Sequence, residues 1–248
     1  MRFIYAMDDK AIVGYFLPTF HLHSEEEHFS MHIENYVKYC QETPDGLNLA
    51  MVNPECEYGR RDELQLITSV VELIDENGAP VVDVVYYVFY PYNGSIDWFG
   101  KGAHWYDMEH ITLRFMGYKS EITQDRRPAK VMFSFHSKYY WFEWNAPELK
   151  IDANGITLNV YVAQGSHACY PEPGRYWRYF GVANDVCDEG FTPQFIVIIM
   201  YDPNLKIFQY RSVCDGDSGR NWNKRELKWG QLPDYTPYGN GASTYFWT

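Results

Sequence analysis

The feature of this sequence that most limits its fold is a series of short apolar or alternating runs, separated by turn residues, with no long helical pattern between them. Runs of this length with a period of two are typical of half-buried strands. Because they follow one another directly, they favour an all-β fold, an antiparallel β-sandwich with long loops. The expected strands are 64–73, 81–90, 110–115, 130–136, 139–144, 156–163, 195–201 and 206–213.

Turn residues support this prediction. The pairs Asn77-Gly78 and Asn154-Gly155 stand between expected strands, and Asn-Gly is the pair favoured in tight hairpin turns. No repeat and no change of composition marks a domain boundary, so we expect one sandwich domain over residues 1–248. Residues 1–64 are expected to form an edge segment and a loop packed on it, and residues 230–248 a tail that wraps its surface.

The amino-terminal part contains few regular elements in this interpretation. Pro18 interrupts the apolar stretch 11–23, which we expect to be an edge strand or an extended segment. Residues 32–39 have room for one or two helical turns, and 41–64 are rich in loop-forming residues. The whole fold is therefore expected to contain at most one or two short helices.

Composition limits the partners. The formal charge of −12 argues against binding to nucleic acid through bulk charge, and any membrane contact must be local and selective. The 22 Tyr, 15 Phe and 8 Trp residues provide flat amphipathic surface for glycans, lipid head groups or protein partners.

Neither the first ten residues nor any later segment carries a long apolar run. We therefore expect no secretory signal in this chain and no transmembrane helix. The five cysteines do not follow a zinc-ligand spacing. Cys40 with Cys56 and Cys169 with Cys187 could form disulfides, but buried free thiols explain them equally well.

The heptapeptide from His104 to His110 is the strongest candidate site. If strand pairing begins near Asp107, alternation places Asp107 and Glu109 on one face and His110 on the other. Two carboxylates on one face repel each other unless a cation or a proton lies between them. With His104 closing from the incoming loop, this oxygen-rich set suits Ca²⁺ or Mg²⁺, with Mn²⁺ as a further candidate.

Other residues could support this site or form sites of their own. Asn93 and Asp97 could supply further oxygen ligands, while Ser166, His167 and His136 stand where expected strands end. A polar surface loop with satisfied histidines remains an alternative for each of them. A serine nucleophile is disfavoured because no Gly-x-Ser-x-Gly elbow is present, and the phosphate-binding glycine motifs are also missing from the sequence.

Three blocks of the sequence resemble a known family. They are residues 17–29, which include His21, His23 and Glu25; residues 89–93 followed by residues 107–110; and residues 160–168, which include Gly165-Ser166-His167. Together they resemble the vacuolar-protein-sorting-related family (Vps62 type) of fungi and its plant counterparts, over about residues 11–215. The family pattern Gly-Asp-Trp-Glu-His corresponds here to a segment in which Met108 replaces Trp.

A more distant similarity is to the necrosis-and-ethylene-inducing-peptide-like cytolysins, whose heptapeptide is Gly-His-Arg-His-Asp-Trp-Glu. His104, Asp107 and Glu109 match the residues that hold a divalent cation in those β-sandwich proteins, which bind sphingolipid head groups and damage membranes. Tyr106 replaces their second His, and Asn93 takes the place of a further Asp ligand.

The resemblance implies a cytolysin-like, divalent-cation-dependent binding or membrane-active protein rather than an enzyme. The cation, held by His104, Asp107, Glu109 and Asn93, would bind hydroxyls of a glycan or glycolipid head group. The neighbouring residues that we expect to contact the ligand or support the site are Asp97, Trp98, Trp105, Tyr106, His110, His136, Ser166 and His167. Two alternatives stay open: a metal-dependent hydrolase or oxygenase on the same sandwich, and a non-catalytic trafficking-related or structural protein.

Overall fold

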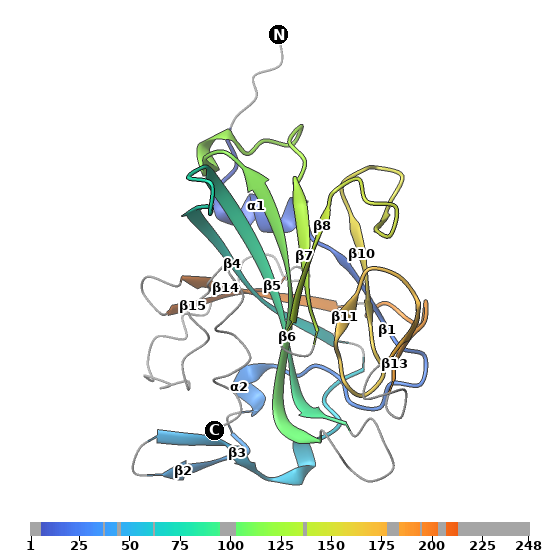
Figure 1. Cartoon of the computed structure of the whole chain (residues 1–248). Helices are drawn as coiled ribbons and strands as arrows, with labels where there is room; N and C mark the ends of the chain where they lie inside the picture. Colours follow the sequence, from blue (N-terminus) through green and yellow to red (C-terminus); the bar gives the residue numbers. More distant parts are fainter. Residues whose placement is uncertain are drawn as a thin grey trace.

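The computed structural model is built on a seven-stranded sheet (Figure 1). It describes residues 6–36, 38–43, 46–61, 63–94, 103–135, 138–177, 184–193, 195–202 and 207–212. The strand order of the sheet is β15-β14-β4-β5-β6-β7-β8, and all neighbours are antiparallel except β14 and β4. These strands are β4 (Glu63–Ile74), β5 (Pro80–Asn93), β6 (His104–Met116), β7 (Lys130–Phe135), β8 (Lys138–Glu143), β14 (Phe195–Asp202) and β15 (Ile207–Ser212).

A smaller sheet contains β10 (Leu158–Val162), which pairs with β1 (Thr19–Leu22) in parallel and with β9 (Lys150–Ile151) and β11 (Cys169–Tyr170) antiparallel. Two separate hairpins complete the described strands. They are β2 (Cys40–Thr43) with β3 (Gly46–Val52), and β12 (Gly174–Tyr176) with β13 (Asp185–Cys187).

One hydrophobic core joins the two sheets. Val84 and Tyr86 of β5 belong to the same buried cluster as Phe20 of β1 and Val160 of β10. Complete burial of a side chain of this size contributes about 1.5–3 kcal/mol. The continuous apolar run of β5 fits its central position, because that strand is buried along nearly its whole length.

The all-β class that the sequence predicts is confirmed, and each of the eight expected strands is present. The hairpin between β4 and β5 turns at Asp75-Glu76-Asn77-Gly78, where Gly78 has a φ of +81° that glycine adopts readily. The core between the two sheets is the arrangement that a sandwich requires.

Two local predictions differ from the structure. Within the stretch 11–23, β1 is the expected edge strand of the smaller sheet. The preceding Asp9–Tyr15 instead forms helix α1, because Asp8 caps it through the backbone N–H of Ala11 and its apolar face is buried against the core. Residues within the predicted loop 41–64 form the hairpin β2–β3. Figure 1 shows α1 and this hairpin at opposite ends of the large sheet.

The other described helices are short. Helix α2 (Ile33–Tyr36) lies in the segment where a helical turn was expected. Two single 3₁₀ turns follow later, Pro54–Cys56 and Lys119–Glu121. None of the helices in the described ranges is long and apolar enough to cross a membrane.

The cysteines at positions 40, 56, 169 and 187 are free thiols. Cys214 and the expected tail 230–248 lie outside the described residues.

Candidate functional site

Asp107 and Glu109 form a carboxylate pair on β6. Alternation places them on the same face as Ile111 and Leu113, which belong to the core between the sheets. His110 lies on the opposite face beside Tyr87, and burial lowers the pKa of His110 to about 4. This arrangement follows the predicted alternation, except that β6 already begins at His104, which was expected in a loop.

Asp107 is surrounded by three polar side chains. Its carboxylate lies 3.7 Å from Nε2 of His104. It accepts a hydrogen bond from Nδ2 of Asn93 at 3.3 Å and another from Nδ1 of His167 at 3.2 Å. Burial on its own raises the pKa of Asp107, but the hydrogen bonds and charges of the two histidines outweigh it and lower the pKa to about 2.

Glu109 has a different environment. Its Oε2 atom accepts a hydrogen bond from Ser134 at 3.1 Å. Burial and the negative charge of Asp107 raise the pKa of Glu109 well above its ordinary value, although the hydrogen bond from Ser134 and the charge of His167 act in the opposite direction. Two negative charges on these neighbouring carboxylates therefore repel each other, and a proton or a cation between them would relieve the repulsion.

His167 links this pair to the amino-terminal part of the chain. Its ring is completely buried and stacks on Tyr90 with 3.7 Å between the ring centroids. Its Nε2 atom donates to the carbonyl of His28 at 2.9 Å and lies 3.7 Å from the carboxylate of Glu26. Burial lowers the pKa of His167, but the charge of Glu26 and the hydrogen bond to Asp107 raise it to about 10.

Glu26 is a site residue that the sequence did not identify. Its buried carboxylate accepts hydrogen bonds from the backbone N–H groups of Glu27, His28 and Gly165. Although burial raises the pKa of Glu26, the charge of His167 and these hydrogen bonds lower it overall. Within the run of three glutamates from Glu25, no spacing distinguishes the buried one from its exposed neighbours.

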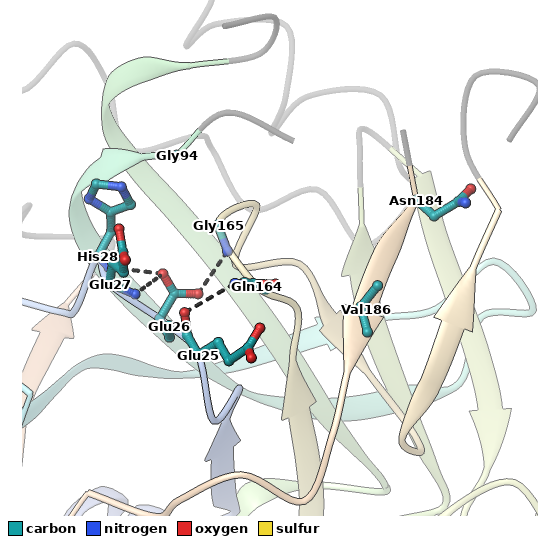
Figure 2. A pocket seen from close by; sticks show the side chains of 9 residues that line it. All are labelled: Glu25, Glu26, Glu27, His28, Gly94, Gln164, Gly165, Asn184 and Val186. Carbon is teal, nitrogen blue, oxygen red and sulfur yellow. Dashed lines mark hydrogen bonds between the residues drawn. The ribbon is translucent and has the colours of Figure 1, made fainter. Parts of the chain in front are cut away.

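A pocket of about 250 Å³ opens beside Glu26 (Figure 2). We call it the glutamate pocket. Figure 2 shows Glu25, Glu26 and Gln164 on one side of it and Asn184 and Val186 on the other. The full lining is Glu25, Glu26, Glu27, His28, Gly94, Gln164, Gly165, Asn184 and Val186.

Glycine is required at one wall of the glutamate pocket. A Cβ atom on Gly94 would lie 2.8 Å from the ring of His28 and 3.3 Å from Cα of Gly165. The backbone N–H of Gly94 donates to the carbonyl of Gly165 at 2.8 Å, so the end of β5 and the turn after β10 are held directly together.

The other residues that the sequence placed near the site lie in different parts of the structure. The hydroxyl of Ser166 donates a hydrogen bond to the buried carboxylate of Asp185 at 2.8 Å. It therefore does not donate to His167, as a serine nucleophile would. Trp105 packs against Tyr92 with 4.9 Å between the ring centroids. Tyr106 lies on β6, but its side chain is outside the described part of the structure, as are the residues Asp97, Trp98 and His136.

These positions bear on the hydrolase or oxygenase alternative. It would use His104, His110 or His167 with a carboxylate, and three of these nitrogens on one transition metal would favour it. The structure separates them, since His110 lies on the other face of β6 and both ring nitrogens of His167 already have partners.

The donor set fits a hard cation, although it is not arranged as a finished site. Among the residues that the structure describes, no group of three or more His, Cys, Asp or Glu side chains is arranged to hold a metal ion. Asp107 would have to exchange one of its present partners for the ion. The hydroxyl of Tyr90 is completely buried without a hydrogen-bond partner. Burial raises its pKa well above the ordinary value, and the charges of Glu26, Asp107 and Glu109 act in the same direction. A buried hydroxyl without a partner is explained where a bound species supplies the missing contact.

Comparison with known proteins identifies the family. No curated protein and no solved structure matches the chain significantly. A model of the family described as vacuolar protein sorting-associated protein 62 matches residues 47–189, which is more than half of the chain. The matched range includes both carboxylates of the pair, Asn93, His104 and His167, whereas Glu26 and His28 precede it. The chain belongs to the Vps62 family.

Proposed function

We propose that this protein is a divalent-cation-dependent binding module that recognises a glycan or lipid head group at the carboxylate pair. Asp107 and Glu109 would hold Ca²⁺ or Mg²⁺, assisted by Asn93 and His104. Mn²⁺ has the same oxygen preference and is a further candidate. The ion would supply open coordination positions to hydroxyl groups of the ligand.

The observation that carries this proposal is the environment of Glu109. It shares one face of β6 with Asp107, and burial and the negative charge of Asp107 raise its pKa well above the ordinary value, a conflict that a bound cation would relieve. Tyr90 pairs with Asp107 across β5 and β6, and its buried hydroxyl has no hydrogen-bond partner.

The surroundings of the pair suit recognition of a head group. Tyr92 and Trp105 form an aromatic pair where β5 and β6 run together, close to Asn93 and His104. Flat amphipathic rings of this kind pack against sugar and lipid head groups. With a net charge of −12, contact with an anionic membrane needs such a local site, because bulk charge opposes it.

Thermal unfolding of the full chain with Ca²⁺, with Mg²⁺ and with EDTA tests the proposal. A ligand that binds only the folded state stabilises it by about 2.7 kcal/mol at a concentration 100 times its Kd. We expect a higher Tm with the cation for the unchanged protein and no cation response for Asp107→Asn or Glu109→Gln. Identical melting curves with EDTA and with Ca²⁺ for the unchanged protein would contradict the proposal.

Three further variants sharpen this experiment. Glu109→Gln keeps the shape of the side chain and removes the charge that burial and Asp107 disfavour, so it should remain at least as stable as the unchanged protein in EDTA while losing the cation response. Asn93→Asp adds a third carboxylate, which should lower the Tm in EDTA and enlarge the shift produced by Ca²⁺. Glu76→Gln alters an exposed carboxylate in the β4–β5 turn and should leave the response unchanged.

A second candidate, a non-catalytic structural or trafficking-related protein, is favoured by one observation. His167 contacts Glu26, His28 and Asp107, and so joins segments that are far apart in the sequence. In that case the cluster serves only to connect loops. Unchanged stability with every cation, together with no binding to vesicles or glycans, would favour this function over the first.

A further inference from the structure

We propose that Ser134 and His167 limit the carboxylate pair to single-oxygen contacts, so that its cation site selects a small octahedral ion, Mg²⁺ or Mn²⁺, over Ca²⁺. This inference rests on the proposed function and adds the class of ion that the site takes. Asp107 and Glu109 lie on the same face of β6, so both can offer oxygen to one ion. The oxygens that already have partners decide how many each can offer.

One oxygen of Asp107 is occupied. Its Oδ2 atom accepts hydrogen bonds from Nδ2 of Asn93 at 3.3 Å and from Nδ1 of His167 at 3.2 Å. Because a carboxylate oxygen has about two lone pairs, these two donors saturate Oδ2. The other oxygen, Oδ1, has a longer contact of 3.7 Å with Nε2 of His104. Oδ1 is therefore the atom of Asp107 that an ion can bind.

His167 is fixed beside Asp107. Its ring is completely buried and stacks on Tyr90 at 3.7 Å, and its Nε2 atom donates to the carbonyl of His28 at 2.9 Å. These contacts hold Nδ1 at Oδ2 of Asp107. Tyr90 also pairs with Asp107 across β5 and β6, and among the described residues its buried hydroxyl has no hydrogen-bond partner. This is an independent indication that a bound species completes the region.

Ser134 has the corresponding role at Glu109. Its hydroxyl donates to Oε2 at 3.1 Å, whereas in the described part of the chain Oε1 has no hydrogen bond or ion pair. The hydroxyl hydrogen carries a partial positive charge and repels an ion that approaches Oε2. Ser134 directly follows Phe133, the last residue of β7 that pairs with β6, so the sheet fixes its position. Glu109 therefore offers Oε1 alone.

The donor atoms that remain match a small ion. Asp107 and Glu109 offer one oxygen each, and Asn93, whose Nδ2 atom is engaged, offers its amide oxygen. Ca²⁺ takes roughly six to eight oxygen ligands and commonly chelates a carboxylate through both oxygens, whereas Mg²⁺ takes about six, keeps several waters and needs only one or two carboxylates. Mn²⁺ accepts the same octahedral arrangement. Single oxygens therefore favour Mg²⁺ and Mn²⁺, and waters or ligand hydroxyls would fill the other positions.

Isothermal titration of the full chain with MgCl₂, MnCl₂ and CaCl₂, after treatment with EDTA and dialysis, tests this selectivity. We expect Mg²⁺ and Mn²⁺ to bind about five-fold or more tightly than Ca²⁺, which should still bind at higher concentration. Ca²⁺ binding as tight as that of Mg²⁺ would overturn the inference and leave the proposed function intact. Absence of binding by all three ions would contradict the proposed function, and the inference with it.

Variants of Ser134 test the cause of the selectivity. Ser134→Ala releases Oε2 of Glu109 so that Ca²⁺ can chelate both oxygens, and we expect the preference for Mg²⁺ over Ca²⁺ to fall by about three-fold or more. Ser134→Thr keeps the hydroxyl and should keep the preference. Ser69→Ala, which removes a buried hydroxyl from β4 of the same sheet, is the matched control.

The ratio of the affinities separates this positioning role from a structural one. Loss of packing around Ser134 would weaken the binding of all three ions by the same factor, whereas loss of its hydrogen bond to Glu109 changes the ratio. An unchanged ratio in Ser134→Ala, or the same change of ratio in Ser69→Ala, would overturn the inference.

Discussion

His167 has an uncommon backbone conformation. Its φ of +56° lies in the left-handed region, which residues other than glycine adopt uncommonly, although Asn, Asp and His do so several times more often than the rest. This conformation is retained because the ring gains Tyr90 as a stacking partner and two carboxylates as ion-pair partners. One residue therefore couples the turn after β10 to β6 and to the segment that contains Glu26.

Replacing His167 by Asn should show how much the charge contributes. Asn accepts the left-handed conformation but leaves Glu26 and Asp107 buried without their cationic partner. Removal of one partner from a buried ion pair costs roughly 3–5 kcal/mol, so we expect a decrease of this order in the free energy of unfolding, measured with urea. An unchanged free energy would show that His167 is neutral in the folded protein.

The pH dependence of stability should have two limbs. The pKa of His167 rises from 6.5 to about 10 on folding, so its contribution is complete below pH 6.5 and is lost as the pH rises toward 10. The pKa of Asp107 falls from 3.8 to about 2, so its contribution is present above pH 3.8 and is lost as the pH falls toward 2.

This pH dependence can be measured by urea unfolding in EDTA between pH 3 and pH 9.5. The alkaline limb should flatten in His167→Asn, because that variant lacks the imidazole whose pKa rises on folding. A limb that stays as steep in the variant would assign the alkaline loss to other groups.

At the scale of elements, the sequence predicted what depends on local periodicity. The alternation along β6 was sufficient to place Asp107 and Glu109 on one face and His110 on the other. It could not identify Glu26, because that residue reaches the site through contacts with Gly165 and His167 that no local pattern encodes. For the same reason the glutamate pocket was not predicted.

Helix α1 was missed because its short apolar stretch continues toward β1 and has no helical periodicity of its own. Its stability comes from tertiary contacts. Ile12 and Val13 are buried, and the carbonyl of Val13 accepts a hydrogen bond from Tyr86 on β5. A helix this short does not form alone in water, so packing decides its existence.

The cap of α1 gives a prediction at this scale. The Asp8 side chain accepts a hydrogen bond from the backbone N–H of Ala11 at 2.8 Å. Asp8→Ala should lower the free energy of unfolding by about 1 kcal/mol, measured with urea, since loss of an N-cap typically costs this much. Lys10→Ala, a change at an exposed position of the same helix, is the control and should have a much smaller effect.

At the scale of the whole molecule, the reactivity of the cysteine thiols measures how well the packed fold shields them from solvent. Cys56, Cys169 and Cys187 are buried, and none of the four described cysteines is paired. Burial raises the pKa of Cys40 to about 12 and that of Cys56 to about 11, and it also raises the pKa values of Cys169 and Cys187. Because the thiolate is the reactive form, all four should react slowly.

A Cys214→Ser variant isolates these four thiols. With a chromogenic disulfide reagent at pH 8, we expect slow modification of the native protein and rapid modification of all four groups in guanidinium chloride. Fast stoichiometric modification of the native variant would show that the region around β2 and β11 opens readily.

The parallel pairing of β14 with β4 also sets an order of events in the cell. Ile196 pairs with Leu64, so an apolar strand made early obtains its neighbour only when a much later segment has left the ribosome. At about 5–20 residues per second, the interval is on the order of ten seconds. During that time one edge of β4 has unpaired backbone groups, which invite association with other chains. The matched residues 47–189 are all synthesised before β14 covers this edge. We therefore expect chaperones to bind the nascent chain during this interval.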